Sequence, residues 1–171
     1  MEPNIDVIIK RYASADMAEI FSQQKRITLW RELWIALAEA EQELGLPIKK
    51  TQIDQLKKYK SKINWDVAEK NEAKFRHDVM AHVHAYGEQC PKAAGIIHLG
   101  ATSAYVTDNA DLIVMKEGLH LVAGKLATVI DRLGLMAKKT KAIPTLAYPH
   151  FQTAQPTTVG KRTCLWLQNF L

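Results

Sequence analysis

The sequence has 171 residues, of which 47% are hydrophobic and 24% are charged, a globular composition that excludes a mainly disordered chain. Its 23 Lys and Arg residues exceed its 18 Asp and Glu residues, but we interpret the lysine-rich segments as solvated helix surfaces rather than a nucleic-acid site. Cys90 and Cys164 are too few for a disulfide framework, and the apolar stretches are shorter than the roughly 20 residues of a membrane helix. We therefore expect a soluble, cytoplasmic protein without a membrane or nucleic-acid partner.

Helical periodicity runs through most of the chain and predicts an all-α fold. Ser14 is a typical N-cap residue, and apolar residues spaced three and four apart predict one helix from there to about Leu44. Thr51 followed by Asp54 resembles an acidic capping box and predicts a short helix to about residue 59.

The middle of the chain adds further helical segments and one irregular stretch. Asn64 is expected to cap a short turn, and a separate helix is expected over residues 73–86. Residues 90–101 contain one proline and two glycines, which predict a loop.

The longest predicted helix begins at Thr107 as its cap and is terminated by Pro144. Its roughly 33 residues would span about 50 Å, more than the ~30 Å diameter of a small domain. We therefore expect an elongated helical bundle that other chains or further sequence complete. A last amphipathic helix is predicted from Thr157 or Thr158 and is expected to continue to Leu171.

Two segments carry side chains suited to binding an anionic ligand. Arg76, His77 and Asp78 offer a cation, a titratable imidazole and a carboxylate, or else are surface and cap residues. The histidines of this segment lack the i, i+4 spacing of a metalloprotease site, so no metal is expected. The glycine-bearing loop that ends in Thr102 and Ser103 could expose N–H groups and hydroxyls to a carboxylate or phosphate, or simply cap a helix.

Two further segments are weaker candidates. His150 stands with glutamines near a helix start, which suits proton transfer, although a lone loop histidine is more often structural. Arg11 and Tyr12 could bind a phosphate through a guanidinium and a hydroxyl donor.

Together these segments resemble adenylosuccinate lyase of the animal type, within the wider fumarase/aspartase superfamily. The resemblance extends from Arg11 to Asn169 and keeps the order of the motifs. The matching segments are Arg76–His84, Gly95–Ser103, Tyr105–Val106, Asp108–Asn109, His150–Gln152, Ala154–Gln155 and Thr157–Arg162.

The resemblance implies an all-α fold, with an N-terminal helical domain over residues 1–106 and the first long helices of a central bundle over residues 107–171. It implies a homotetramer whose active sites draw on three subunits. The implied reaction is the β-elimination of fumarate from adenylosuccinate, giving AMP, and from succinylaminoimidazole carboxamide ribotide, in purine nucleotide biosynthesis. No metal or organic cofactor is implied.

The resemblance also assigns roles to the candidate residues. It implies that His150 is the general acid and that His77 lies close to the reacting part of the substrate. The implied substrate-binding residues are Arg11 and Tyr12 for the phosphate, Thr102 and Ser103 for a carboxylate, and the triplet Arg76, His77 and Asp78.

Two departures leave a second hypothesis open. Pro149 replaces the threonine that the family places before its catalytic histidine, and Thr153 stands where the family has proline. The resemblance also places the catalytic serine base beyond residue 171, so we expect this chain alone to be inactive. The alternative is a non-catalytic scaffold or regulatory short form that keeps the fold and nucleotide binding.

Overall fold

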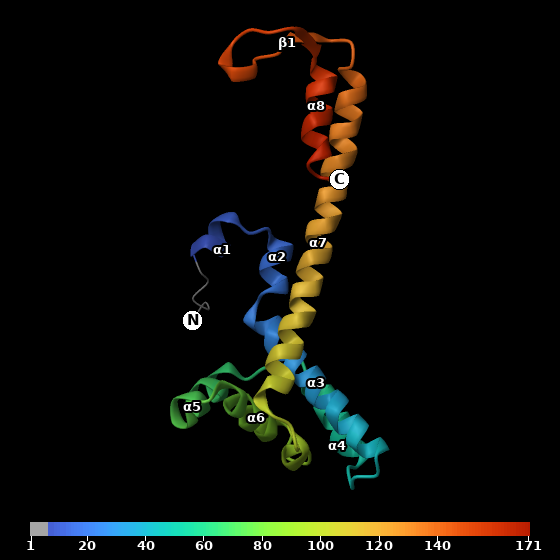
Figure 1. Cartoon of the computed structure of the whole chain (residues 1–171). Coiled ribbons are helices and arrows are strands. Elements are labelled where there is room, and N and C mark those ends of the chain that lie inside the picture. The colour runs from blue at the N-terminus through green and yellow to red at the C-terminus, as the bar shows by residue number, and fades with distance from the viewer. Residues whose placement is uncertain (1–6) are drawn as a thin grey trace. The chain divides into compact units, whose positions relative to one another are not determined.

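The computed structural model describes residues 7–171 and divides the chain into two compact units, Met1–Gly118 and Leu119–Leu171, here called the first and the second unit. The helix α7 contributes residues to both units (Figure 1). The elements of the first unit are α1 Val7–Tyr12, α2 Ala15–Ile20, α3 Gln23–Glu43, α4 Lys50–Tyr59, α5 Trp65–Phe75, α6 Asp78–Gln89, the short 3₁₀ helix η1 Ala94–Ile96 and the start of α7 Ser103–Lys139.

The predicted single helix from Ser14 to Leu44 is wrong, because two helices occupy this stretch. Ser14 does cap a helix, since its Oγ accepts from the backbone N–H of Met17 at 3.3 Å. A second hydroxyl interrupts the run, however, as Ser22 Oγ accepts from the N–H of Lys25 at 3.1 Å and begins α3. A single capping side chain can therefore start a new helix even where the apolar periodicity continues without a break.

The next boundaries also differ from the prediction. The Thr51–Asp54 capping box is wrong, because α4 begins at Lys50 and Gln52 Oε1 accepts from the N–H of Lys49 at 2.8 Å. Asn64 does cap a helix, but α5 continues through the start of the predicted 73–86 helix to Phe75.

The break between α5 and α6 falls at two of the candidate residues. Arg76 takes the left-handed conformation, with φ 52° and ψ 40°, and ends α5. His77 is then the N-cap of α6, which runs to Gln89 rather than to residue 86. A non-glycine residue in this conformation is uncommon, so the sequence contains no ordinary signal for the break.

The long helix α7 begins four residues before its predicted cap. Thr107 lies inside the helix, where its hydroxyl donates to the carbonyl of Ser103 at 3.2 Å. The helix has 37 residues and is therefore about 55 Å long. In the described part of the chain, no helix combines the length and the apolar character needed to cross a membrane.

The core of the first unit lies between α3, α4, α6 and the first turns of α7. Trp34 is fully buried and its ring packs against Trp30 and Tyr86. Burial of aromatic and aliphatic side chains is the main stabilising contribution to such a unit. The buried members are Ile27, Leu29, Trp30, Trp34, Ile35, Ala38, Ile48, Ile53, Leu56, Val79, Tyr86, Cys90, Ala93, Ile96, Ile97, Val106, Ala110 and Val114.

A buried arginine crosses this core. Arg31 donates to the carbonyls of Tyr59 and Lys62 at 2.7 and 3.1 Å and to Gln89 Oε1 at 2.9 Å. Its guanidinium also lies 4.1 Å from the centroid of the Tyr86 ring. Burial lowers the pKa of Arg31. These contacts join α3 to the end of α4, the following turn and α6.

The second unit is a helical hairpin with a small sheet at its turn. The end of α7 is followed by β1 Pro144–Leu146, the 3₁₀ helix η2 Pro149–Phe151, β2 Pro156–Thr158 and α8 Val159–Gln168. The two strands are antiparallel, with Thr145 opposite Thr157. The sequence did not predict them, because three residues are too few to establish an alternating pattern.

Helix α8 packs back against the end of α7 (Figure 1). The predicted start is confirmed, since Thr158 Oγ1 accepts from the N–H of Lys161 at 3.2 Å. The backbone N–H of Gly160 donates to the carbonyl of Thr140 at 3.1 Å. The helix ends at Gln168, so the expected continuation to Leu171 is wrong. The fold as a whole is all-α.

Candidate functional site

The structure brings together two of the predicted segments, although they are 26 residues apart in the chain. His77 Nε2 lies 3.3 Å from Ser103 Oγ, which joins the start of α6 to the start of α7. Asp78 follows His77 directly, and its Oδ1 accepts from the N–H of Val79 at 2.7 Å. A helix N-terminus with a hydroxyl and an imidazole beside it favours an anionic ligand.

Two groups lie at the same distance from Nδ1 of His77. The backbone N–H of Met80 is 3.5 Å away, which makes His77 the N-cap of α6, and Asp78 Oδ1 is also 3.5 Å away. Nε2 and Ser103 Oγ form a hydrogen bond in which either group can donate, according to the tautomer of the ring. The imidazole, the hydroxyl and the helix N-terminus together present hydrogen-bonding groups at this edge of the first unit.

A second imidazole belongs to the same edge and was not among the predicted site residues. His98 is half-buried, and its Nδ1 accepts from the indole N–H of Trp34 at 3.0 Å. Burial lowers the pKa of His98, and the neighbouring His77 lowers it further. The loop in which His98 lies was recognised from the sequence, but its partner Trp34 is 64 residues away and nothing in the sequence links the two.

The other predicted residues of the first unit are exposed. Thr102 immediately precedes α7, and its carbonyl accepts from the N–H of Tyr105 at 2.9 Å. Arg11 and Tyr12 end α1, where the guanidinium lies 5.8 Å from the centroid of the tyrosine ring. No hydrogen bond or ion pair within residues 7–171 joins this pair to His77, so the structure does not bring them together.

His150 belongs to the second unit, at the tip of the β1–β2 hairpin. It follows Pro149, the first residue of η2, and its side chain is exposed. The hairpin is closed where the N–H of Ala154 donates to the carbonyl of Ala147 at 2.9 Å. Arg162 on α8 braces its base by donating to the carbonyl of Leu146 at 2.6 Å. An exposed imidazole on a closed turn can exchange a proton with a ligand.

Backbone strain in the described part of the chain falls on these same segments. Its non-glycine residues with positive φ are Arg76, His98, His150 and Phe151, with φ between 52° and 64°. Such conformations cost of order 1–3 kcal/mol and cluster at functional sites. The strain therefore supports the choice of these segments over the remaining helical surface.

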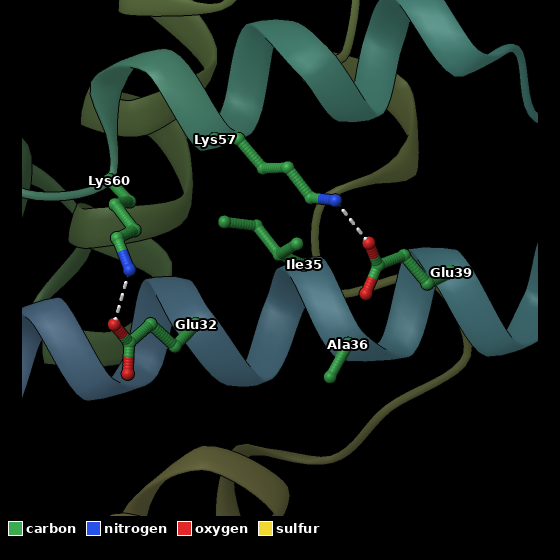
Figure 2. A pocket seen from close by; sticks show the side chains of 6 residues that line it. All are labelled: Glu32, Ile35, Ala36, Glu39, Lys57 and Lys60. Carbon is green, nitrogen blue, oxygen red and sulfur yellow. Dashed lines mark hydrogen bonds and ion pairs between the residues drawn. The ribbon is translucent and has the colours of Figure 1, made fainter.

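A groove between α3 and α4 is not part of this site. It encloses about 290 Å³, and its charged groups are paired with one another, since Lys60 binds Glu32 at 2.7 Å and Lys57 binds Glu39 (Figure 2). The bond to Glu39 raises the pKa of Lys57. The groove therefore fastens α4 to α3 rather than offering free charges to a ligand. It is lined by Glu32, Ile35, Ala36, Glu39, Lys57 and Lys60.

A family model described as "Lyase" matches residues 11–171. Among curated relatives, the chain is 48% identical over 164 residues to an adenylosuccinate lyase of Schistosoma mansoni, covering 96% of this chain and 34% of the relative. It is 52% identical over 165 residues to an adenylosuccinate lyase of Schizosaccharomyces pombe, covering 94% of this chain and 34% of the relative. The chain thus spans about a third of the length of these relatives.

Solved structures share the fold at lower identity. A 3-carboxy-cis,cis-muconate lactonizing enzyme from Pseudomonas putida superimposes with a TM-score of 0.84 at 24% identity, over 96% of this chain and 38% of that one. A fumarate lyase from Mesorhizobium sp. BNC1 gives a TM-score of 0.80 at 24% identity, over 90% of this chain and 37% of that one. These similarities establish the helical fold and say nothing of the reaction.

Proposed function

The chain belongs to the lyase family, and we propose that it forms the N-terminal part of an adenylosuccinate lyase. The observation that carries the proposal is the bond of 3.3 Å between His77 and Ser103, which assembles two motifs of the resemblance into one donor-rich edge. Relatives about 50% identical bear the name adenylosuccinate lyase, which supports this choice among lyases.

The proposed reaction is a β-elimination that releases fumarate. A base removes a proton from the carbon next to a carboxylate, the electron pair forms the carbon–carbon double bond, and the carbon–nitrogen bond breaks. The departing nitrogen takes a proton from an acid. Negative charge develops on the carboxylate, so nearby donors stabilise the transition state.

Each candidate residue has a proposed part in this reaction. His150 protonates the departing nitrogen, and His77 lies at the reacting part of the substrate. Ser103 and Thr102 bind a carboxylate through their hydroxyls. The remaining proposed contacts are Arg76 and Asp78 with the substrate and Arg11 and Tyr12 with its phosphate.

The domain and assembly proposals rest on the long helices. We assign residues 1–106 to an N-terminal helical domain and residues 107–171 to the start of a central bundle. In the second unit, apolar side chains on α7 and α8 are exposed, which supports burial of these faces in a homotetramer. The exposed residues in question are Val122, Val129, Leu135, Met136, Leu165 and Trp166.

The wider setting follows from the same proposal. The substrates would be adenylosuccinate and succinylaminoimidazole carboxamide ribotide, both polyanions, and the setting would be purine biosynthesis in the cytoplasm. The net charge of +5 suits such ligands.

The alternative is a non-catalytic scaffold, and Pro149 is the observation that favours it. Proline lacks a backbone N–H and a hydroxyl, so it removes two possible donors directly before His150. A chimera separates the two functions. Residues 11–171 replace the matching stretch of the S. pombe relative, and fumarate release from adenylosuccinate is measured.

We expect the chimera to release fumarate, and we expect His77→Ala to slow it by at least about a hundredfold. His84→Ala is the matched control, since His84 is an exposed histidine that stacks on Phe75, with ring centroids 4.6 Å apart. Its rate should stay within about twofold of the unmodified chimera. A helical, assembled chimera that releases no fumarate would establish the scaffold alternative instead.

A further inference from the structure

The hydrogen bond between Trp34 and His98 determines the state of the imidazole. An indole nitrogen can only donate, so the Nδ1 that it contacts at 3.0 Å must be unprotonated. The proton of the neutral ring is therefore on Nε2. The rings meet edge to face, with centroids 5.9 Å apart and planes at 78°, so the contact also fixes the ring's orientation.

The packing around Trp34 keeps its indole N–H directed at His98. It is fully buried, and its ring lies against Tyr86 at 6.2 Å and against Trp30 at 6.4 Å, centroid to centroid. His98 itself has a left-handed backbone, with φ 64°. A strained residue bonded to an immobile partner has little freedom to turn its ring.

The surroundings of His98 favour its neutral form. Burial lowers the pKa of His98, and the neighbouring His77, which lies 3.3 Å from Ser103, lowers it further. Protonation of His98 would place a hydrogen on Nδ1, directly opposite the indole N–H. With Nδ1 occupied, Nε2 is the nitrogen through which His98 can contact a ligand.

We propose that Trp34 is a positioning residue whose indole N–H locks His98 as the neutral tautomer that carries its proton on Nε2. His98 then adds a hydrogen-bond donor to the edge that already holds His77 and Ser103. Such a set of donors selects ligands by their carboxylate, phosphate or carbonyl oxygens. The role in turnover rests on the proposed lyase function, whereas the tautomer itself does not.

The tautomer is measured on the 171-residue chain without any substrate. The chain is labelled with ¹⁵N-histidine, and the two-bond ¹H–¹⁵N correlations of its imidazoles distinguish protonated from bare nitrogens. The chain has 6 histidines, and the signals of His98 are identified by their loss in His98→Gln. We expect a single tautomer with the proton on Nε2, and a proton on Nδ1 or an averaged ring overturns the proposal.

Two substitutions at position 34 remove the indole donor, and a third variant, at position 30, is the control. In Trp34→Phe, and with a benzothienyl analogue of tryptophan at position 34 that keeps the volume, His98 should become a mixture of tautomers. Its pKa should rise, because the lost hydrogen bond no longer favours the neutral ring. Trp30→Phe is the control, since Trp30 Nε1 has no partner among residues 7–171.

The outcomes are distinct. A tautomer that survives both changes at position 34, or that is lost equally in Trp30→Phe, overturns the role of the indole N–H. In the chimera, Trp34→Phe should lower kcat/KM for fumarate release about fivefold to tenfold relative to Trp30→Phe. An active chimera without that difference overturns the positioning role. A chimera without fumarate release overturns the proposed function, while the spectra still decide the tautomer.

Discussion

Gly160 is the position where a single methyl group should disrupt the second unit. A Cβ at this residue would lie 2.5 Å from the carbonyl oxygen of Ala137 and 2.7 and 2.8 Å from the Cα and N of Lys141. All three are backbone atoms, and real Cβ contacts are essentially never shorter than 3.0 Å. Gly160→Ala therefore forces α8 away from the end of α7 by about half an ångström or more.

The magnitude follows from the cost of overpacking. Inserting a methyl group into a tight contact costs typically 1–3 kcal/mol, and backbone atoms on both sides place this site near the upper value. The better helix propensity of alanine offsets about 0.5 kcal/mol. We expect a net loss of roughly 2 kcal/mol in local stability.

Hydrogen exchange of the α8 amides measures this loss directly, because local opening exposes them. A change of roughly 2 kcal/mol corresponds to about a thirtyfold drop in the protection of residues 163–168. Gly134→Ala is the matched control, since a Cβ there meets no atom within 4 Å. It should leave protection equal or slightly higher. Unchanged protection in Gly160→Ala would refute the close approach of α8 to α7.

Three further predictions concern the buried polar groups. Burial lowers the pKa of His82 from 6.5 to about 4, so the unfolded state takes up a proton first as the pH falls. The free energy of unfolding should therefore decrease by about 3 kcal/mol between pH 6.5 and pH 4. Urea titrations at the two pH values should show this decrease in the unmodified chain and not in His82→Gln. Cys90 is buried and its pKa is raised to about 11, whereas Cys164 is exposed. A thiol reagent at neutral pH should therefore modify one cysteine in the folded chain and both in urea, and rapid modification of both when folded would contradict the packing. Arg31→Met should cost about 3 kcal/mol in urea unfolding, because it removes three hydrogen bonds that the guanidinium donates inside the core. Lys60→Met removes an exposed ion pair and should cost less than about 1 kcal/mol, and equal losses would argue against the buried network.

The periodic apolar pattern predicted the helical class and most of the helices, because helix-spaced apolar faces are a local property of the sequence. It did not predict the breaks. Ser22 and His77 cap helices inside stretches that read as continuous, and Arg76 ends α5 without the glycine that usually marks such a stop. Both kinds of break depend on one side chain or one backbone angle rather than on a pattern.

The site could be predicted only in part for a related reason. Each segment was recognised from its own residues, and the contact of His77 with Ser103 then required the folded backbone. The bond from Trp34 to His98 spans 64 residues, and a tryptophan within an apolar helix face is indistinguishable by sequence from any other core residue. Long-range hydrogen bonds thus complete what local motifs only suggest.

Selection for stability and selection for ligand binding should favour different residues at four positions with left-handed backbone, Arg76, His98, His150 and Phe151. Glycine would adopt the same backbone angles without a Cβ penalty, so a library of this chain screened for thermal tolerance alone should drift toward glycine at these codons. A library screened for ligand capture should keep the original side chains. Positions that change to glycine in the first screen but keep their side chain in the second would then be identified as ligand-binding residues, even when the ligand is unknown.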